Sequence, residues 1–173
     1  MKSAPQISKA VAALCPQCAL CCNGVIFGDV RLQAGDDADR LRELGVPLRQ
    51  RGAVTRFAQP CSCLEGALCT IYPDRPRRCR TFECRLLQRH QQGEVTARAA
   101  LQAIARARRH ADKIRRLLRQ LGNTDEAKPL ARRYAQVMRQ PVDLAAGPRQ
   151  GDLQGALMRA VAELADVLER DFL

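Results

Sequence analysis

The C-terminal half of the sequence has the clearest pattern of apolar and polar positions. Apolar residues recur at steps of three and four between Glu94 and Leu121, which predicts an amphipathic helix. Gly122 follows and can end this helix in a left-handed cap. A second helix is expected from Pro129 to Gln140, and a third from Asp152 to about Phe172. Between these two, Pro141 to Gly151 is predicted to be a turn-rich linker.

The N-terminal half shows only short periodic stretches. A short helix is predicted from Ala38 to Leu44, because Asp36 and Asp37 can open it and Gly45 can terminate it. Short strands are expected at Gly24–Phe27, Val46–Leu48 and Ala53–Phe57. The predicted fold class is therefore mainly α with a few short strands.

The cysteines divide the chain into two predicted parts. All nine lie between Cys15 and Cys84, and after about residue 90 the composition becomes rich in the helix formers Ala, Leu and Arg. We expect a Cys-rich, metal-organised domain over residues 1–90 and a basic helical hairpin or bundle over residues 91–173. Aromatic residues make up only 3% of the chain and Trp is absent, so something besides a core of Leu, Ala and Val is expected to help fix the fold.

The interpretation of the cysteines depends on whether the protein is in a reducing or an oxidising compartment. No stretch approaches the ~18 to 20 apolar residues of a membrane span. The apolar run Ala10–Leu14 is too short for a signal peptide. We therefore expect the reducing cytoplasm, where disulfides do not persist and clustered cysteines are usually ligands or catalytic groups. The odd total and the adjacent Cys21 and Cys22 also argue against a disulfide framework.

Four of the cysteines fall within eight residues: Cys15, Cys18, Cys21 and Cys22. Two-residue spacers let successive thiolates turn back toward one point, with amides of the loop able to donate to sulfur. Buried, inert cysteine is the alternative interpretation, but four thiols so close together exceed any packing need. This first cluster therefore predicts a metal site.

A second group follows at Cys61, Cys63, Cys69, Cys79 and Cys84. Together the two groups resemble the YkgJ family of bacterial cysteine-cluster proteins, which are described as zinc- or iron-chelating domains. The shared features are the CxxCxxCC opening, Cys61 with Leu64, and a closing pattern carried by Cys69, Ile71, Tyr72, Arg75, Pro76, Cys79, Arg80 and Cys84. The resemblance covers residues 15–84 and does not extend over residues 95–173.

The resemblance implies roles for individual residues. Cys63 falls where the family has an aromatic or apolar residue, so it is expected to pack as a small hydrophobe. Arg75 and Arg80 match the family pattern and are expected to offset the thiolate charge as a second shell around the ligands. The other eight cysteines are the expected metal ligands: Cys15, Cys18, Cys21, Cys22, Cys61, Cys69, Cys79 and Cys84.

The spacing leaves the cofactor open between zinc and an iron–sulfur cluster. Cys15, Cys18 and Cys21 have the C-x2-C-x2-C spacing that supplies three ligands to a ferredoxin-type cluster. Zinc usually takes paired CxxC or Cys/His sets, and only one end of the constellation supplies close pairs. The balance favours an iron–sulfur cluster by a small margin. Since adjacent side chains project in different directions, Cys21 and Cys22 are expected to serve two metals or opposite sides of one cluster.

The charge of the chain bears on its partners. A formal net charge of +11 makes the surface attractive to polyanions. The arginines of the helix predicted at residues 94–121 form its polar face, and a protein- or polyanion-binding face is the alternative to plain solvated surface. The scarcity of aromatic stacking residues and the lack of a recognised motif argue against specific nucleic-acid binding.

Three functions from different classes remain open. The first is a metal-binding or electron-transfer module whose metal is structural or redox-active. The second is an enzyme, because proteins similar to this domain include flagellin lysine methylases, and the resemblance implies a cluster-dependent protein modification. The third is a zinc-stabilised regulator that binds a polyanion. The sequence shows no Gly-rich cofactor loop or recognised catalytic pattern, so metal binding without catalysis is the prediction.

Overall fold

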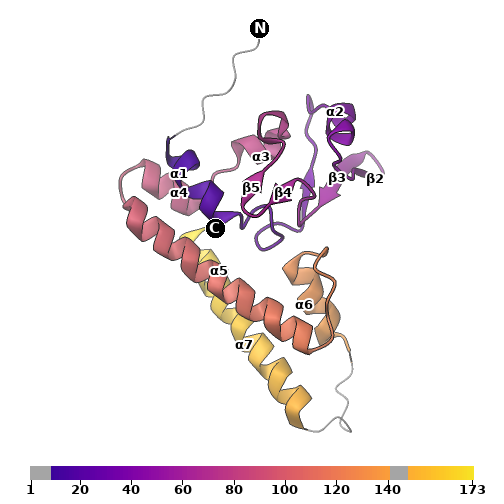
Figure 1. Ribbon diagram of the computed structural model, residues 1–173, viewed down its shortest axis with the longest axis vertical. Coiled ribbons are helices and arrows are strands. Elements are labelled where there is room, and N and C mark those ends of the chain that lie inside the picture. Colours follow the sequence, from indigo (N-terminus) through magenta and orange to yellow (C-terminus); the bar gives the residue numbers. More distant parts are fainter. Residues whose placement is uncertain (1–8, 141–147) are drawn as a thin grey trace.

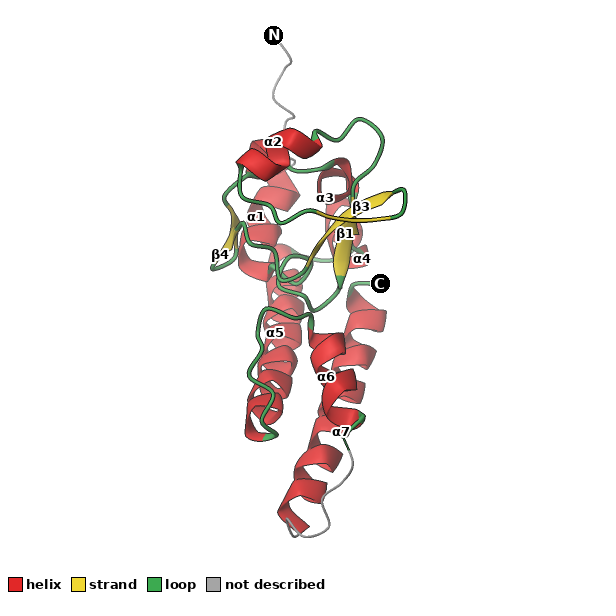
Figure 2. Cartoon of the chain, turned by 90° about the vertical axis from the view of Figure 1, so that its right-hand side faces the viewer, coloured by secondary structure: helices red, strands yellow, loops and turns green. Residues whose placement is uncertain are grey.

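A computed structural model describes residues 9–140 and 148–173 of the chain. Two long antiparallel helices, α5 (Ala97–Gln120) and α7 (Pro148–Asp171), form a stem (Figure 1). The shorter α6 (Leu130–Met138) packs beside the half of the stem that lies away from the Cys-rich part. The Cys-rich part sits at the end of the stem where α5 begins and α7 ends (Figure 2). The predicted fold class, mainly α with a few short strands, is confirmed.

The stem forms along the apolar stripes seen in the sequence. Thr96 caps α5 by accepting a hydrogen bond of 3.2 Å from the N–H of Ala99. Ala107 and Ala111 are fully buried on the face of α5 that meets α7, and their small side chains allow the two helices to approach closely. Across the described residues, no helix carries an apolar stretch long enough to cross a membrane.

The Cys-rich part is built from short elements joined by tight turns. They are α1 (Lys9–Cys18), β1 (Asp29–Arg31), α2 (Ala38–Glu43), β2 (Arg49–Arg51), β3 (Val54–Ala58), β4 (Leu64–Glu65), β5 (Leu68–Cys69), the 3-10 turn η1 (Tyr72–Asp74), α3 (Arg77–Thr81) and α4 (Arg85–Gln91). Strands β1, β3 and β2 form an antiparallel sheet in that order, with Val30 opposite Phe57. Strands β4 and β5 form a separate hairpin in which Leu64 faces Cys69.

Three apolar clusters hold these elements together. The first joins α1 and α4 to the beginning of α5 and the end of α7, and it includes Leu20, Leu86, Ile104 and Phe172. The second joins α5, α6 and α7. The third lies in the Cys-rich part and consists of Val30, Leu41, Val46, Phe57, Cys63 and Ile71. Because the first cluster contains residues from both sides of residue 90, the two predicted domains share a core there, and their division at that point stays a prediction.

Several predicted short elements differ from the structure. Residues 24–27 form a turn instead of a strand, because the carbonyl of Gly24 accepts a 2.9 Å hydrogen bond from the N–H of Leu130 at the start of α6. Residues 46–48 are irregular, and the strand expected there begins at Arg49. Of the linker predicted at Pro141–Gly151, residues 141–147 lie outside the described residues, and residues 148–151 belong to the first turn of α7.

Candidate metal centre

The first four cysteines lie at the end of α1 and in the turn that follows it: Cys15, Cys18, Cys21 and Cys22. The helix ends at Cys18 because Ala19 takes a positive φ of 56° and reverses the chain. Leu20 then enters the first apolar cluster with no exposed surface, which anchors the turn. The N–H of Cys22 closes it with a 2.9 Å hydrogen bond to the carbonyl of Ala19. The structure thus gives the CxxCxxCC motif a fixed helix-and-turn backbone.

Cys84 joins three of these thiols from a distant part of the sequence. It precedes α4, which packs on α1, and it accepts hydrogen bonds from the amides of Leu86 and Leu87. Its thiol lies within electrostatic range of the other three. We call these four residues thiol set A: Cys15, Cys18, Cys21 and Cys84.

The remaining predicted ligands form thiol set B: Cys22, Cys61, Cys69 and Cys79. The thiol of Cys79, on α3, lies within electrostatic range of the other three. Among the thiols, Cys69 has the largest effect on Cys22. Cys61, Cys69 and Cys79 pack against the third apolar cluster, whereas Cys18 and Cys84 pack against the first. The two sets adjoin at the Cys21–Cys22 step, where Cys22 also lies within electrostatic range of Cys21 and Cys15.

Cys63 is more deeply buried than these eight residues, although its thiol also lies within electrostatic range of Cys61 and Cys69. Its side chain is 5% exposed and belongs to the third apolar cluster. The sulfur lies 3.8 Å from the carbonyl oxygen of Leu44 and 3.8 Å from the hydroxyl of Ser62. It therefore packs as the small hydrophobe that the sequence predicted.

Arg75 lies between the two thiol sets. Its guanidinium stacks 3.5 Å above the ring centre of Tyr72 and donates hydrogen bonds to the carbonyls of Tyr72, at 3.1 Å, and Cys79, at 3.4 Å. The thiols within its electrostatic range come from both sets and are Cys15, Cys22, Cys69 and Cys79. Arg80 is exposed on α3, and a role for it beside the ligands stays a prediction.

Arg108 is a neighbour of the thiols that sequence reasoning missed. It lies on the polar face of α5, but its guanidinium donates a 2.7 Å hydrogen bond to the carbonyl of Gln17 and lies within electrostatic range of Cys18. No local signal distinguishes Arg108 from the other arginines of α5, because the contact arises only when α1 packs across that helix.

Backbone amides are already directed at half of the candidate sulfurs. Four cysteines accept a hydrogen bond from the N–H two residues further along the chain. The donor and acceptor pairs are Leu20 with Cys18, Cys63 with Cys61, Ile71 with Cys69, and Leu86 with Cys84. Such donors stabilise a thiolate and orient it toward a metal, so this backbone suits a thiolate centre.

The thiols are protonated at neutral pH when no metal is bound. Burial is the main cause, and it raises the pKa of Cys15 to about 11 and that of Cys18, Cys61 and Cys79 to about 12. Burial also raises the pKa of Cys21, Cys22, Cys69 and Cys84. A metal that binds here must therefore displace protons, and its positive charge would compensate the repulsion among neighbouring thiolates.

The candidate sulfurs lie near one another but do not form a complete metal-binding arrangement. Within residues 9–140 and 148–173, no three Cys, His, Asp or Glu side chains converge at metal-binding distance. The backbone that carries sets A and B is in place, and the thiols would have to close in around a bound ion or cluster by side-chain rotation.

Comparison with known proteins adds one match to this geometry. A family model described as "CxxCxxCC: putative zinc- or iron-chelating domain" matches residues 14–102, which include all nine cysteines and the beginning of α5. No curated protein and no solved structure matches the chain. The match covers more than half of the sequence, and with it the chain belongs to the CxxCxxCC family of zinc- or iron-chelating domains.

Proposed function

We propose that this chain is a cytoplasmic metal-binding protein with two all-thiolate centres, one in set A and one in set B. The observation that carries the proposal is that Cys18 and Cys84 of set A pack against the first apolar cluster, whereas Cys61, Cys69 and Cys79 of set B pack against the third. Four thiolates are a complete ligand set for a structural zinc ion or for an iron–sulfur cluster. All nine cysteines are free thiols, which suits a reducing compartment.

The position of the Cys21–Cys22 pair supports two centres over one. Cys21 lies within electrostatic range of Cys22 as well as of the three other members of set A, whereas the thiol with the largest effect on Cys22 is Cys69 of set B. Bacterial two-cluster ferredoxins use a similar device, in which the fourth cysteine of the run ligates the other cluster. Adjacent cysteines would then connect the two centres through a single peptide bond.

The two sets differ in the cofactor they favour. Set A combines a C-x2-C-x2-C run with a distant fourth cysteine, which is the ligand spacing of a ferredoxin-type cluster. Set B takes single cysteines from four separate segments, and any all-thiolate ion or cluster fits it. We therefore propose an iron–sulfur cluster in set A and either zinc or a second cluster in set B.

The metal has a structural role in this proposal. The third apolar cluster contains only six buried residues, yet it must hold β1, β2, β3, α2 and α3. A structural zinc site contributes about 10 kcal/mol or more to folding, which is larger than such a small core can supply. A redox role for the same centres would follow if set A holds an iron–sulfur cluster.

The basic surface supports a second candidate function, the binding of a polyanion or an acidic protein. Arg109 and Arg116 are exposed on α5, and the chain has a net charge of +11. Other arginines of this helix already make internal contacts, such as Arg106 with Asp171 at 3.6 Å, so the free basic surface is smaller than the sequence indicated. A steep decrease in affinity for heparin or DNA with salt would support this function.

The experiment that tests the main proposal is anaerobic purification of the full-length chain followed by metal and sulfide analysis and a visible absorption spectrum. Two iron–sulfur clusters per chain would give iron, acid-labile sulfide and a broad visible absorbance. Two zinc ions would give a colourless protein, and one centre of each kind would give both signals. A chain that retains neither metal, or that holds one ion per molecule at saturation, would contradict two thiolate centres.

A further inference from the structure

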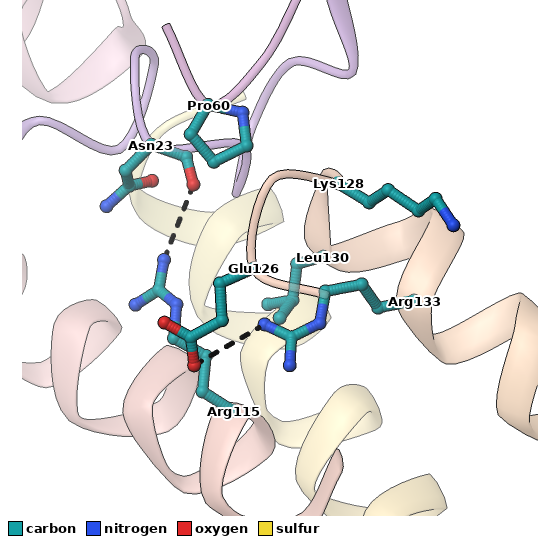
Figure 3. A pocket seen from close by; sticks show the side chains of 7 residues that line it. All are labelled: Asn23, Pro60, Arg115, Glu126, Lys128, Leu130 and Arg133. Carbon is teal, nitrogen blue, oxygen red and sulfur yellow. Dashed lines mark hydrogen bonds and ion pairs between the residues drawn. The ribbon is translucent and has the colours of Figure 1, made fainter. Parts of the chain in front are cut away.

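A cationic cavity lies between the Cys-rich part and the helices of the stem. Its volume is about 260 Å³, and it is lined by Asn23, Pro60, Arg115, Glu126, Lys128, Leu130 and Arg133 (Figure 3). One wall is formed by residues next in sequence to two cysteines of set B. Asn23 follows Cys22, and Pro60 precedes Cys61. The opposite walls come from α5, from α6 and from the loop between them.

The cavity contains a buried cation. The side chain of Arg133 is 2% exposed, although its residue type is almost always found at the surface. Its Nε donates a 3.0 Å hydrogen bond to the side-chain oxygen of Asn123, and one terminal nitrogen donates a 2.8 Å hydrogen bond to the carbonyl of Asn123. The other terminal nitrogen, Nη1, lies 4.0 Å from Glu126 Oε1, which is an ion pair longer than a hydrogen bond.

Two further cations line the same space. Arg115 is held by Asp112 at 2.9 Å and by the carbonyl of Asn23 at 3.4 Å. Lys128 lines the cavity from the loop before α6, but its ammonium pairs with Asp125 at 2.9 Å and points away from Arg115 and Arg133 (Figure 3). Burial lowers the pKa of Arg133, and its neighbour Arg115 adds repulsion between like charges. The charge lining the cavity is therefore positive, with Glu126 as its one carboxylate.

Glu126 is the carboxylate that lies next to the buried guanidinium of Arg133. Its carboxylate accepts a 2.6 Å hydrogen bond from Arg119 and lies 4.0 Å from Arg133, while the residue itself is 53% exposed. A carboxylate on an exposed loop can swing away at little cost, because surface ion pairs contribute about 0 to 1 kcal/mol. We propose that this cavity binds a small oxyanion, of the carboxylate or phosphate type, between Arg133 and Arg115.

The size of the cavity limits the ligand. A water molecule in the liquid occupies about 30 Å³, so the space fits an ion such as phosphate or a short dicarboxylate together with several waters. This volume lies just below the roughly 300 to 1,000 Å³ of pockets that bind drug-sized ligands. The planar guanidinium groups of Arg115 and Arg133 suit an oxyanion, which they can bind through two oxygens.

The test is calorimetric titration of the full-length protein with its bound metal, using inorganic phosphate in one arm and malonate in the other, at low chloride concentration. Arg115→Gln removes one of the two guanidinium groups that line the cavity. Arg116→Gln on α5 and Arg132→Gln on α6 are the matched controls, because both residues are exposed and stand next in sequence to residues of the cavity. Circular dichroism verifies the fold of every variant.

We expect measurable binding of at least one of the two anions, weakened about tenfold by Arg115→Gln and unchanged by both controls. Glu126→Gln should strengthen binding severalfold, because it removes the competing carboxylate, and a gain in affinity cannot come from misfolding. Phosphate binding alone would identify a phosphate-bearing ligand, and malonate binding alone a carboxylate. The absence of binding in both arms, or an equal loss in Arg116→Gln and Arg115→Gln, would overturn the proposal in favour of unspecific surface charge.

Discussion

The backbone N–H of Cys61 donates a 2.8 Å hydrogen bond to the carbonyl oxygen of Cys22. This bond fixes the end of the CxxCxxCC motif to the second group of cysteines, which lies far along the chain. It also determines the neighbours of two adjacent residues, because Cys21 remains among the thiols at the end of α1 while Cys22 is held beside Cys61. A backbone hydrogen bond therefore helps to separate sets A and B, in addition to the packing of their side chains.

If this division is correct, neighbouring cysteines will have separable effects on metal content. Cys21→Ser should remove the centre of set A and leave that of set B, whereas Cys22→Ser should do the reverse, because each centre loses one of four ligands. Metal and sulfide analysis of the purified variants measures the loss. The matched control is Cys63→Ser, which should keep both centres, since Cys63 packs in the third apolar cluster.

Two results for these cysteine variants would contradict the assignments. If Cys21→Ser and Cys22→Ser both abolish all bound metal while Cys63→Ser does not, the eight thiols hold a single centre. If Cys63→Ser also loses metal without a loss of stability, the assignment of Cys63 as a packing residue is wrong.

Gly24 is expected to be essential for the contact between the cysteine turn and α6. It has a φ of +77°, and a Cβ added there would lie 3.0 Å from the Cα of Pro129. Gly24→Ala should therefore cost about 1–2 kcal/mol for the left-handed backbone and about 1–3 kcal/mol more for the clash. Denaturant unfolding of the metal-loaded protein measures the difference in free energy.

Gly35→Ala is the control that separates these two costs. Gly35 has a similar φ of +87°, but a Cβ there would meet no atom within 4 Å. Gly35→Ala should therefore lower the free energy of unfolding only by the cost of the left-handed backbone. Equal destabilisation of the two variants would show that the approach of Pro129 to Gly24 is not tightly packed.

The stem could be predicted from the sequence because its signal is local. The spacing of apolar residues placed a helix over 94–121, and α5 runs from Ala97 to Gln120; the last predicted helix likewise overlaps α7. The predicted short helix at residues 38–44 and the strand at residues 53–57 also match α2 and β3 within one residue at each end. In each of these segments, local residues determine both the type of element and its approximate ends.

The Cys-rich part was harder to predict because contacts distant in sequence determine its form. Nothing near residues 24–27 indicates that Gly24 will bond to Leu130 and replace a strand by a turn. Motif spacing and family resemblance identified the candidate ligands, but their grouping follows from the packing of α1 on α4 and from the hydrogen bond between Cys61 and Cys22, which the sequence does not reveal. The neighbours Arg108 and Glu126 were unpredictable for the same reason.

Metal removal is expected to loosen one region selectively. The segment from β1 to α3 depends on the third apolar cluster and on set B, whereas α1 and α4 also pack on the stem. Amide hydrogen exchange of verified metal-free protein should show faster exchange in residues 29–81, while the part of α5 in the second cluster, around Ile114 and Leu118, keeps its protection. Unchanged protection of residues 29–81 would show that the ligands do not organise this fold.

Metal-free protein should become less stable in alkaline solution. Burial raises the pKa of Cys15 to about 11 and that of Cys18 to about 12 in the folded chain, from an ordinary value of 9.0. Above pH 9 the unfolded chain loses these thiol protons first, so it binds fewer protons than the folded chain and the free energy of unfolding falls. This contribution is fully present below pH 9 and is lost as the pH rises toward about 12.

Denaturant unfolding at a series of pH values measures this decrease. Cys18→Ala, also metal-free, should show a shallower decrease because one buried thiol is gone. The metal-loaded protein should show almost none over the same range, because its thiolates carry no protons to lose. Parallel curves for Cys18→Ala and the unmodified metal-free chain would mean that other groups cause the alkaline loss.

The last prediction concerns Arg75, the cation between the two thiol sets. Arg75→Gln removes a positive charge that lowers the pKa of Cys15, Cys22, Cys69 and Cys79 against the larger effect of burial. These thiols should then release their protons less readily, and metal affinity should fall about tenfold or more in competition with a chelator at neutral pH.

Two variants give this result its meaning. Arg75→Lys keeps the charge but loses the planar group that stacks on Tyr72 and bonds to the carbonyl of Cys79, so an intermediate affinity is expected. Arg77→Gln removes an exposed arginine of α3 close to Cys79 in the sequence and should leave the affinity unchanged. Equal losses of metal affinity in Arg75→Gln and Arg77→Gln would mean that the effect comes from the overall charge of the protein. A loss in Arg75→Lys as large as in Arg75→Gln would instead assign Arg75 a structural role, because the retained charge would then have no effect on the thiols.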